Sequence, residues 1–194
     1  KKRKKELMEL FSRFKEETKD IGIRLYLGNE LFIDSQLDEL LLNEEICSMN
    51  ESEYVLIEFP FDRYRSEYDE YLYNVSLNYK IIIAHPERYG YVQKDIRFTE
   101  RWTDEGYYLQ SNQDSLKYRE TRKVIYSLIE KGKLSFLASD CHNLLRPLHL
   151  SDAYAQISRK FSKETAELLM NINPMRVIKD EAVKKVPSIK KHLF

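Results

Sequence analysis

The 194-residue sequence contains only two cysteines, five glycines and five prolines, and it carries no net charge. Cys47 and Cys141 lie far apart and form no C-x-x-C pair. This excludes a disulfide scaffold and a structural zinc knuckle, and it favours a reducing compartment. No apolar run approaches the roughly 18 residues of a membrane span, and no signal peptide is recognised. We therefore expect a cytoplasmic protein without membrane insertion.

An excess of charge of one sign is also missing. Lys+Arg and Asp+Glu both number 32, so net charge indicates neither nucleic acid nor a membrane surface as a partner. The basic run at residues 1–5 leads into an amphipathic helix, so a solvated helix start is favoured over a nucleic-acid arm. With 42% hydrophobic and 12% aromatic residues, the composition is that of a folded globular chain. Residues 1–194 are expected to form one domain.

Short apolar segments alternate with helical patterns along the chain. Leu7, Leu10, Phe11 and Phe14 have helical spacing and predict an amphipathic helix with one buried face. The predicted strands are 23–27, 54–59, 81–84, 107–109 and 134–138. The predicted helices are 5–18, 36–42, 65–79, 92–105, 116–131 and 150–183, the last with a break at Asn173-Pro174.

This alternation predicts an α/β fold built on a parallel sheet. Five strands are too few to close a barrel of seven or eight βα units. Two interpretations remain open, namely an open doubly wound sheet and most of a barrel whose first strands are missing.

Polar residues that could bind a metal or take part in catalysis follow the predicted strands. Glu30, His85, Asp140 and His142 each come just after a strand, and the carboxyl ends of parallel strands gather on one face where active sites form. Carboxylates and neutral imidazoles suit Mn²⁺, Fe²⁺ or Zn²⁺. Each residue also has a structural interpretation: a hydrogen-bonded loop histidine, a charge that complements a helix dipole, or a turn cap. Spacing alone leaves both open.

Two arginines follow the histidines. Arg88 lies three residues after His85 and Arg146 four residues after His142, so both could hold a phosphate in bidentate fashion beside a metal. Without the neighbouring residues, the two arginines are equally consistent with ordinary exposed side chains on the surface. Cys141 lacks a Cys-x5-Arg phosphate loop, which disfavours a thiol mechanism and favours a small packed side chain.

Several segments resemble a known family and occur in its order. They are Gly28-Asn29-Glu30, Tyr54–Pro60, Ala84–Tyr89, Gln110-Ser111-Asn112, Leu137–Asn143 and Asn173-Pro174. Over nearly its whole length the chain resembles the PHP-fold (polymerase and histidinol phosphatase) protein-tyrosine phosphatases of capsular and exopolysaccharide loci in Gram-positive bacteria. The segments around His85 and Asp140 are quite specific, whereas Gly-x-Glu alone would be weak.

The resemblance implies a distorted (β/α)7 barrel with a centre of up to three ions, usually manganese. Glu30 would bridge two ions, His85, Asp140 and His142 would be further ligands, and Arg88 and Arg146 would hold the phosphate. A metal-bound hydroxide would attack phosphorus while the ions neutralise the developing charge. The substrate implied is phosphotyrosine on a tyrosine kinase that controls polysaccharide export.

The sequence departs from the family pattern at its beginning. Family members open with a His-x-His strand, a nearby Asp, a Glu on the first helix and a His that ends the second strand, and none is found before Glu30. We therefore expect an N-terminally incomplete PHP-type domain that is inactive alone. Its open sheet edges predict oligomerisation or strand exchange. Two alternatives stay open: a phosphatase of small metabolites such as histidinol phosphate, and a non-catalytic truncated relative that binds a partner protein.

Overall fold

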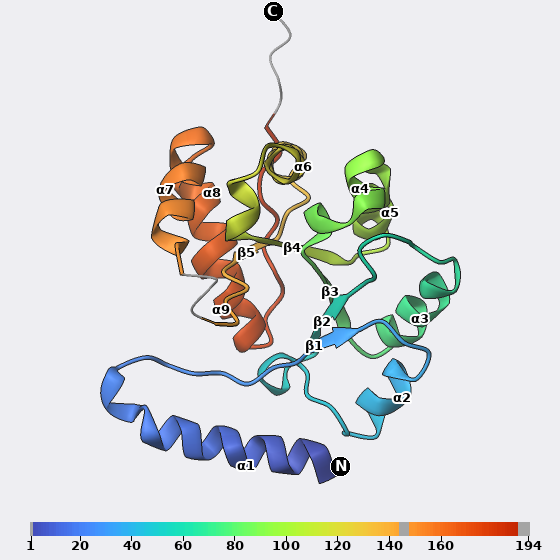
Figure 1. Ribbon diagram of the computed structural model, residues 1–194, viewed down its shortest axis with the longest axis vertical. Coiled ribbons are helices and arrows are strands. Elements are labelled where there is room, and N and C mark those ends of the chain that lie inside the picture. Colours follow the sequence, from blue (N-terminus) through green and yellow to red (C-terminus); the bar gives the residue numbers. More distant parts are fainter. Residues whose placement is uncertain (1, 144–147, 190–194) are drawn as a thin grey trace, which may run out of the picture.

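A computed structural model describes residues 2–143 and 148–189, and it contains a parallel sheet in which the described strands follow their chain order (Figure 1). The strands are β1 (Glu30–Phe32), β2 (Tyr54–Glu58), β3 (Lys80–Ala84), β4 (Tyr108–Asn112) and β5 (Phe136–Ala138). All four neighbouring pairs are parallel. The predicted parallel α/β sheet is confirmed, and β2 and β3 fall close to their predicted ranges.

The helices lie mainly on one side of this sheet. They are α1 (Lys2–Glu17), α2 (Leu37–Leu42), α3 (Glu67–Ser76), α4 (Gly90–Lys94), α5 (Arg97–Asp104), α6 (Arg119–Glu130), α7 (Leu150–Lys160), α8 (Lys163–Glu167) and α9 (Asn173–Ile178). The 3-10 helices are η1 (Lys19–Ile21), η2 (Met49–Glu51), η3 (Pro86–Arg88) and η4 (Gln113–Leu116), and η5 (Leu168–Ile172) is a π-helical turn. No helix of the described residues is long and apolar enough to cross a membrane.

Alternate residues of the strands place their side chains on opposite faces of the sheet. Val55, Ile57, Ile81 and Ile83 belong to the main core together with residues of α2 to α8. Their neighbours Tyr54 and Ile82 belong to a small second cluster on the opposite face, as the two-residue period of a strand requires.

Strictly sequential strand order is the arrangement that right-handed crossovers produce when their helices cover one face. A doubly wound sheet reverses its strand order at a switch point and carries helices on both faces. The strand order of the described residues is therefore not that of a doubly wound sheet.

The predicted strand at residues 23–27 is wrong, because β1 begins only at Glu30. Glu30 pairs with Leu56, and the same register would place residues 23–27 opposite residues 49–53. That stretch contains the turn η2 rather than a strand, and the Leu27 carbonyl accepts a hydrogen bond of 2.6 Å from the Asn50 amide instead. Among the described residues, segment 23–27 has no strand to pair with, and Glu30 lies at the start of its strand, not after it.

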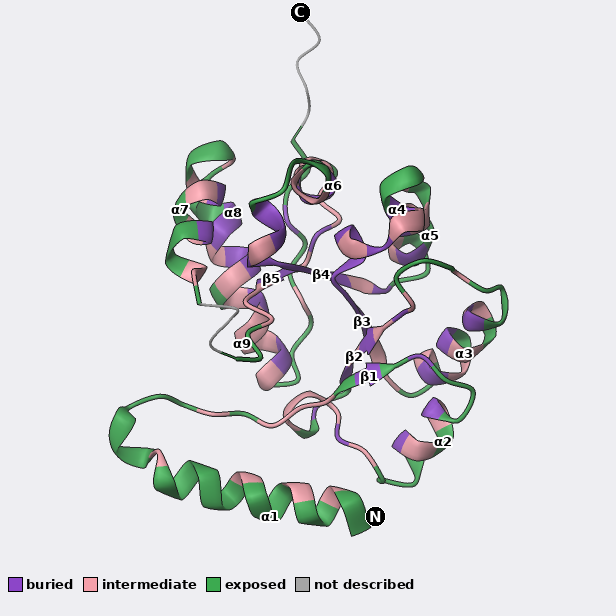
Figure 2. Cartoon of the chain, in the orientation of Figure 1, coloured by how far each residue is buried: buried purple, intermediate pink, exposed green. Residues whose placement is uncertain are grey.

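The predicted buried face of the first helix is also wrong. Helix α1 forms over nearly the predicted range but contains no buried residue, and Leu10 and Phe14 are 60% and 52% exposed. Figure 2 shows the helix exposed or partly exposed along its whole length. Local spacing made the helix amphipathic, but burial of its apolar stripe needs a second element packed against it.

Several further elements differ in extent from their predictions. The helix expected at 92–105 is divided into α4 and α5, and β4 runs on to Asn112 rather than ending at Leu109. The helix expected at 150–183 is divided into α7 and α8 at Phe161-Ser162, a break that was not predicted, and its helical structure ends at Ile178. Pro174 does not break it outright: it lies in the first turn of α9, directly after the π-helical turn η5, where its missing N–H is tolerated.

Candidate metal centre

Four polar side chains lie where the parallel strands end. Glu58 is the last residue of β2, His85 follows β3, Asn112 is the last residue of β4, and Asp140 lies two residues past β5. Because the strands are parallel, these positions share one edge of the sheet. Glu30 joins them from β1, since its partner Leu56 is on the same face as Glu58.

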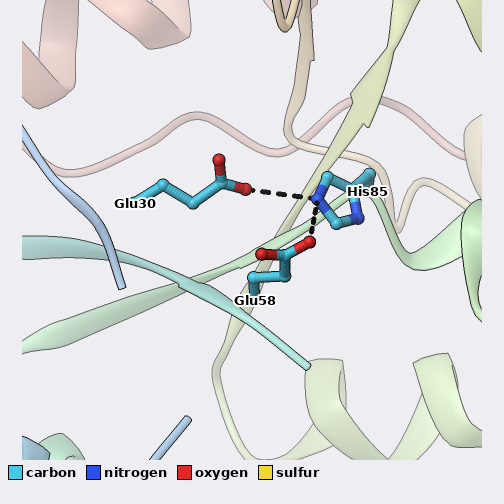
Figure 3. Close-up of side chains that lie close together, drawn as sticks. All are labelled: Glu30, Glu58 and His85. Atoms are coloured by element: carbon cyan, nitrogen blue, oxygen red, sulfur yellow. Dashed lines mark ion pairs between the residues drawn. The ribbon is translucent and has the colours of Figure 1, made fainter. Parts of the chain in front are cut away.

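The first ligand group consists of Glu30, Glu58 and His85. The His85 Nε2 atom lies 3.2 Å from Oε1 of Glu30 and 3.3 Å from Oε1 of Glu58 (Figure 3). Two ligand atoms that each lie about 2.1 Å from one ion, at angles of about 90–110°, are separated by about 3.0–3.4 Å. The three side chains therefore fit a divalent cation, which would also offset the repulsion between the two carboxylates.

The second ligand group consists of Glu30, Asp140 and His142, whose ligand atoms all lie within 4.8 Å of one another. The His142 Nδ1 atom is 3.1 Å from Oδ1 of Asp140. Glu30 belongs to both groups, which is the position of a carboxylate that bridges two ions. The hydrogen bond with His85 outweighs partial burial and lowers the pKa of Glu30, so its carboxyl group stays in the ionised form that a metal requires.

The backbone is strained at two of these residues. His85 has φ 31° and Asp140 has φ 49°, values in or near the left-handed region that residues with a Cβ rarely adopt. The ring of Pro86 also disfavours the right-handed helical region for His85. Such strain persists where surrounding structure fixes it, and it concentrates at ligand-binding and catalytic sites.

Arg88 provides a cation beside the carboxylates. Its Nη1 atom lies 3.3 Å from Oδ2 of Asp140, and its guanidinium carbon lies 4.7 Å from the centroid of the Phe61 ring. A guanidinium held in this way is suited to bidentate recognition of phosphate. Arg146, the second arginine predicted for this role, lies outside the described residues.

The structure brings Glu30, His85, Asp140, His142 and Arg88 around one cavity of about 360 Å³. The prediction that Cys141 packs inside is wrong: its side chain is exposed, with Sγ 3.9 Å from the carbonyl oxygen of Asn143. Cys47 is the buried cysteine instead.

Sequence reasoning missed three residues of this site. Glu58 was assigned only to a predicted strand. Its place at the end of that strand, before Phe59-Pro60, is the same kind of signal that identified His85. Asn112 donates a 2.6 Å hydrogen bond from Nδ2 to Oδ2 of Asp140. Phe61 lines the same cavity as the ligands, and no spacing rule would have placed a loop aromatic there.

A buried hydrogen-bond network lies behind the ligands. Gln110 Nε2 donates to Oδ1 of Asn112 at 2.8 Å, and the backbone amide of Asn112 donates to Oε1 of Glu87 at 3.0 Å. Glu87 is fully buried, and its burial raises the pKa of its carboxyl group. Strand β4 thereby presents Asn112 to Asp140 in a fixed orientation.

The fold and the site together define an α/β protein with a candidate cation-binding cluster at the carboxyl edge of a parallel sheet. The chain belongs to the CpsB/CapC family of capsular polysaccharide synthesis. The sequence model of this family matches residues 1–179.

Its relatives include tyrosine-protein phosphatases of three bacteria. YwqE of Bacillus subtilis is 26% identical over 173 residues, which cover 87% of this chain and 68% of YwqE. CpsB of Streptococcus agalactiae serotype V is 29% identical over 171 residues, covering 83% of this chain and 70% of the relative. CpsB of Streptococcus pneumoniae is 29% identical over 189 residues, covering 91% and 78%.

A solved structure agrees with these relatives. It comes from work on YwqE of Bacillus subtilis and CpsB of Streptococcus pneumoniae, described as unique metal-dependent tyrosine phosphatases. It superimposes with a TM-score of 0.83 at 26% identity, covering 95% of this chain and 76% of the solved one. The similarity in fold therefore extends over nearly the whole of this chain.

Proposed function

We propose that this protein is a metal-dependent phosphatase that hydrolyses phosphotyrosine in proteins and acts in capsular polysaccharide synthesis. The observation that carries the proposal is the position of Glu30, shared by two ligand groups and adjacent to Arg88. A bridged pair of cations beside a guanidinium is an arrangement suited to phosphate esters. The relatives are named tyrosine-protein phosphatases, which supports the choice of substrate class.

Each residue has a defined part in this proposal. Glu30, Glu58 and His85 would hold one ion, and Glu30, Asp140 and His142 a second. Bound divalent ions supply Lewis-acid chemistry, in that they activate water and neutralise charge on phosphoryl oxygens. Arg88 would bind the phosphate oxygens and hold them in place, with Asp140 and Phe61 fixing its guanidinium. Arg146 is proposed as a second phosphate ligand from the sequence alone.

Finer details remain proposals supported by the resemblance. Manganese is the proposed metal, with Fe²⁺ and Zn²⁺ as alternatives for the same oxygen and nitrogen ligands. A third ion, a seven-stranded barrel and a tyrosine kinase of polysaccharide export as substrate are proposed on the same basis. The cytoplasmic location rests on composition. Self-association rests on the position of β1 at the edge of the described sheet.

The decisive experiment compares substrates. Phosphate release would be measured from a phosphotyrosine peptide and from histidinol phosphate, with Mn²⁺ and after chelation. It would be run on the 194-residue chain and on the whole product of its gene. The proposal expects metal-dependent release that prefers the phosphotyrosine peptide. A preference for histidinol phosphate would establish the small-molecule alternative, and no release from either protein would establish a non-catalytic relative.

A further inference from the structure

A second cavity adjoins the metal centre and shares a wall with it. It has a volume of about 520 Å³, within the roughly 300–1,000 Å³ of typical ligand sites. Phe61, Arg88 and Asp140 line both this cavity and the one that holds the ligand groups. A phosphate held at Arg88 would therefore lie at the junction, with the group that carries it free to extend into the second cavity.

Phe61 is held in place at this junction. Its ring stacks on the His85 ring, with centroids 5.6 Å apart and an interplanar angle of 21°, and the Arg88 guanidinium lies over it. Despite these contacts Phe61 remains 42% exposed. The exposed part of this ring lies beside the Arg88 guanidinium, where it can contact a further ring.

The remaining lining of the cavity is polar but includes a second aromatic ring. Tyr118, which precedes α6, is 64% exposed and lines this cavity. Asn112 and Asp114 lie along the same cavity, and the Asp114 carboxylate is paired with Lys117 at 2.7 Å. A ligand with a flat apolar ring and a polar chain would suit this cavity. The ring would contact the aromatic side chains, and the polar chain would contact the polar part of the lining.

We propose that this second cavity is the subsite for the phosphotyrosine side chain, with Phe61 stacking on its ring and setting the preference for aryl over alkyl phosphates. The inference rests on the proposed function and deepens it. An alkyl phosphate such as phosphoserine can reach Arg88 but has no ring to lie against Phe61. Phe61 is therefore a specificity residue, distinct from the groups that bind phosphate.

The test separates stacking from support of Arg88. Calorimetry on Mn²⁺-loaded protein would give the Kd of a non-hydrolysable phosphonate analogue of a phosphotyrosine peptide and the Kd of inorganic phosphate. Phe61→Leu keeps apolar bulk without the ring and should weaken binding of the analogue about three- to tenfold more than it weakens binding of inorganic phosphate. Phe61→Tyr keeps an aromatic ring and should bind the analogue as tightly as the wild-type protein does. Tyr73→Leu, at an exposed aromatic on α3 that lines neither cavity, should match the wild type.

The possible outcomes distinguish a failure of the proposed subsite from a failure of the proposed phosphatase function. An equal loss of both ligands in Phe61→Leu, or no loss, overturns the subsite while phosphotyrosine hydrolysis by the wild-type protein still stands. Failure of the wild-type protein to bind the analogue overturns the subsite as well. Absence of phosphate release from a phosphotyrosine peptide overturns the proposed function, and it is measured separately from the ratio of the two Kd values.

Discussion

Asn112 donates a hydrogen bond of 2.6 Å to the carboxylate of Asp140, joining the end of β4 to the segment that follows β5. Gln110 in turn holds the Asn112 side chain at 2.8 Å. Asp140 can therefore present its other oxygen, Oδ1, toward His142. Groups that orient metal ligands in this way influence metal affinity without touching the ion.

Asn112→Ala should weaken Mn²⁺ binding about 10- to 100-fold, the usual effect of removing a group that orients a ligand. The reason is that Asp140 loses a donor that fixes its rotamer. Metal titration by calorimetry measures the effect, and thermal unfolding checks that the variant is folded. Asn78→Ala, in the turn before β3, is the matched control. Unchanged affinity in Asn112→Ala would show that Asp140 needs no such orientation.

Glu58→Gln should reduce the amount of bound metal and lower turnover more than about 100-fold, beyond the effect of an orienting group. Glu58 is one of the two carboxylates that converge on His85 Nε2, and a neutral amide is a poorer ligand for a hard cation. Elemental analysis and phosphate release measure the two effects. Glu53→Gln, just before the opposite end of β2 and paired with Lys80, is the control. Full metal content in Glu58→Gln would remove this residue from the centre.

Arg88→Ala should weaken inorganic phosphate binding and lower kcat/KM about 100-fold, because charge-assisted contacts to phosphate contribute about 1.5–3 kcal/mol. Arg88→Lys should recover only part of this, since an ammonium group lacks the planar fork. Steady-state kinetics and phosphate titration measure both. The control is Arg97→Ala, an exposed arginine at the start of α5 that is paired with Asp95. Near-normal kinetics in Arg88→Ala would make the arginine structural.

Glu87→Ala should lower the free energy of unfolding by about 2–3 kcal/mol, because it leaves the buried amide of Asn112 without its acceptor. Glu87→Gln should cost less than about 1 kcal/mol. Burial raises the pKa of Glu87, so a neutral side chain with an acceptor oxygen is a close substitute. Urea unfolding followed by circular dichroism compares them. An equally large loss in both variants would mean that the carboxyl group itself is required.

The parts of the fold that sequence predicted were those fixed by local pattern. The apolar run Ile81–Ala84 ends at His85-Pro86, and Tyr54–Glu58 ends near Pro60, so both strands were recognised within about a residue. Parallel topology then placed His85 and Asp140 on one edge of the sheet, as the prediction required.

The parts that failed depend on distant partners. Residues 23–27 had the composition of a strand but face the turn η2 rather than a strand, and the apolar stripe of α1 contains no residue that is buried against the described part of the chain. Glu58 and Asn112 were overlooked because their roles come from side chains that meet across neighbouring strands. A single strand, taken alone, does not show which of its terminal residues meet side chains of the neighbouring strands.

The most direct test of the account follows phosphate release from a phosphotyrosine peptide as bound metal is removed and restored. The protein, as the whole product of its gene, would be stripped with a chelator, assayed, and assayed again with increasing Mn²⁺. We predict no activity in the stripped protein, recovery with Mn²⁺, and no recovery in Glu58→Gln at the same concentrations. Hydrolysis that persists in the stripped protein, or that recovers equally in Glu58→Gln, would contradict the metal centre described above.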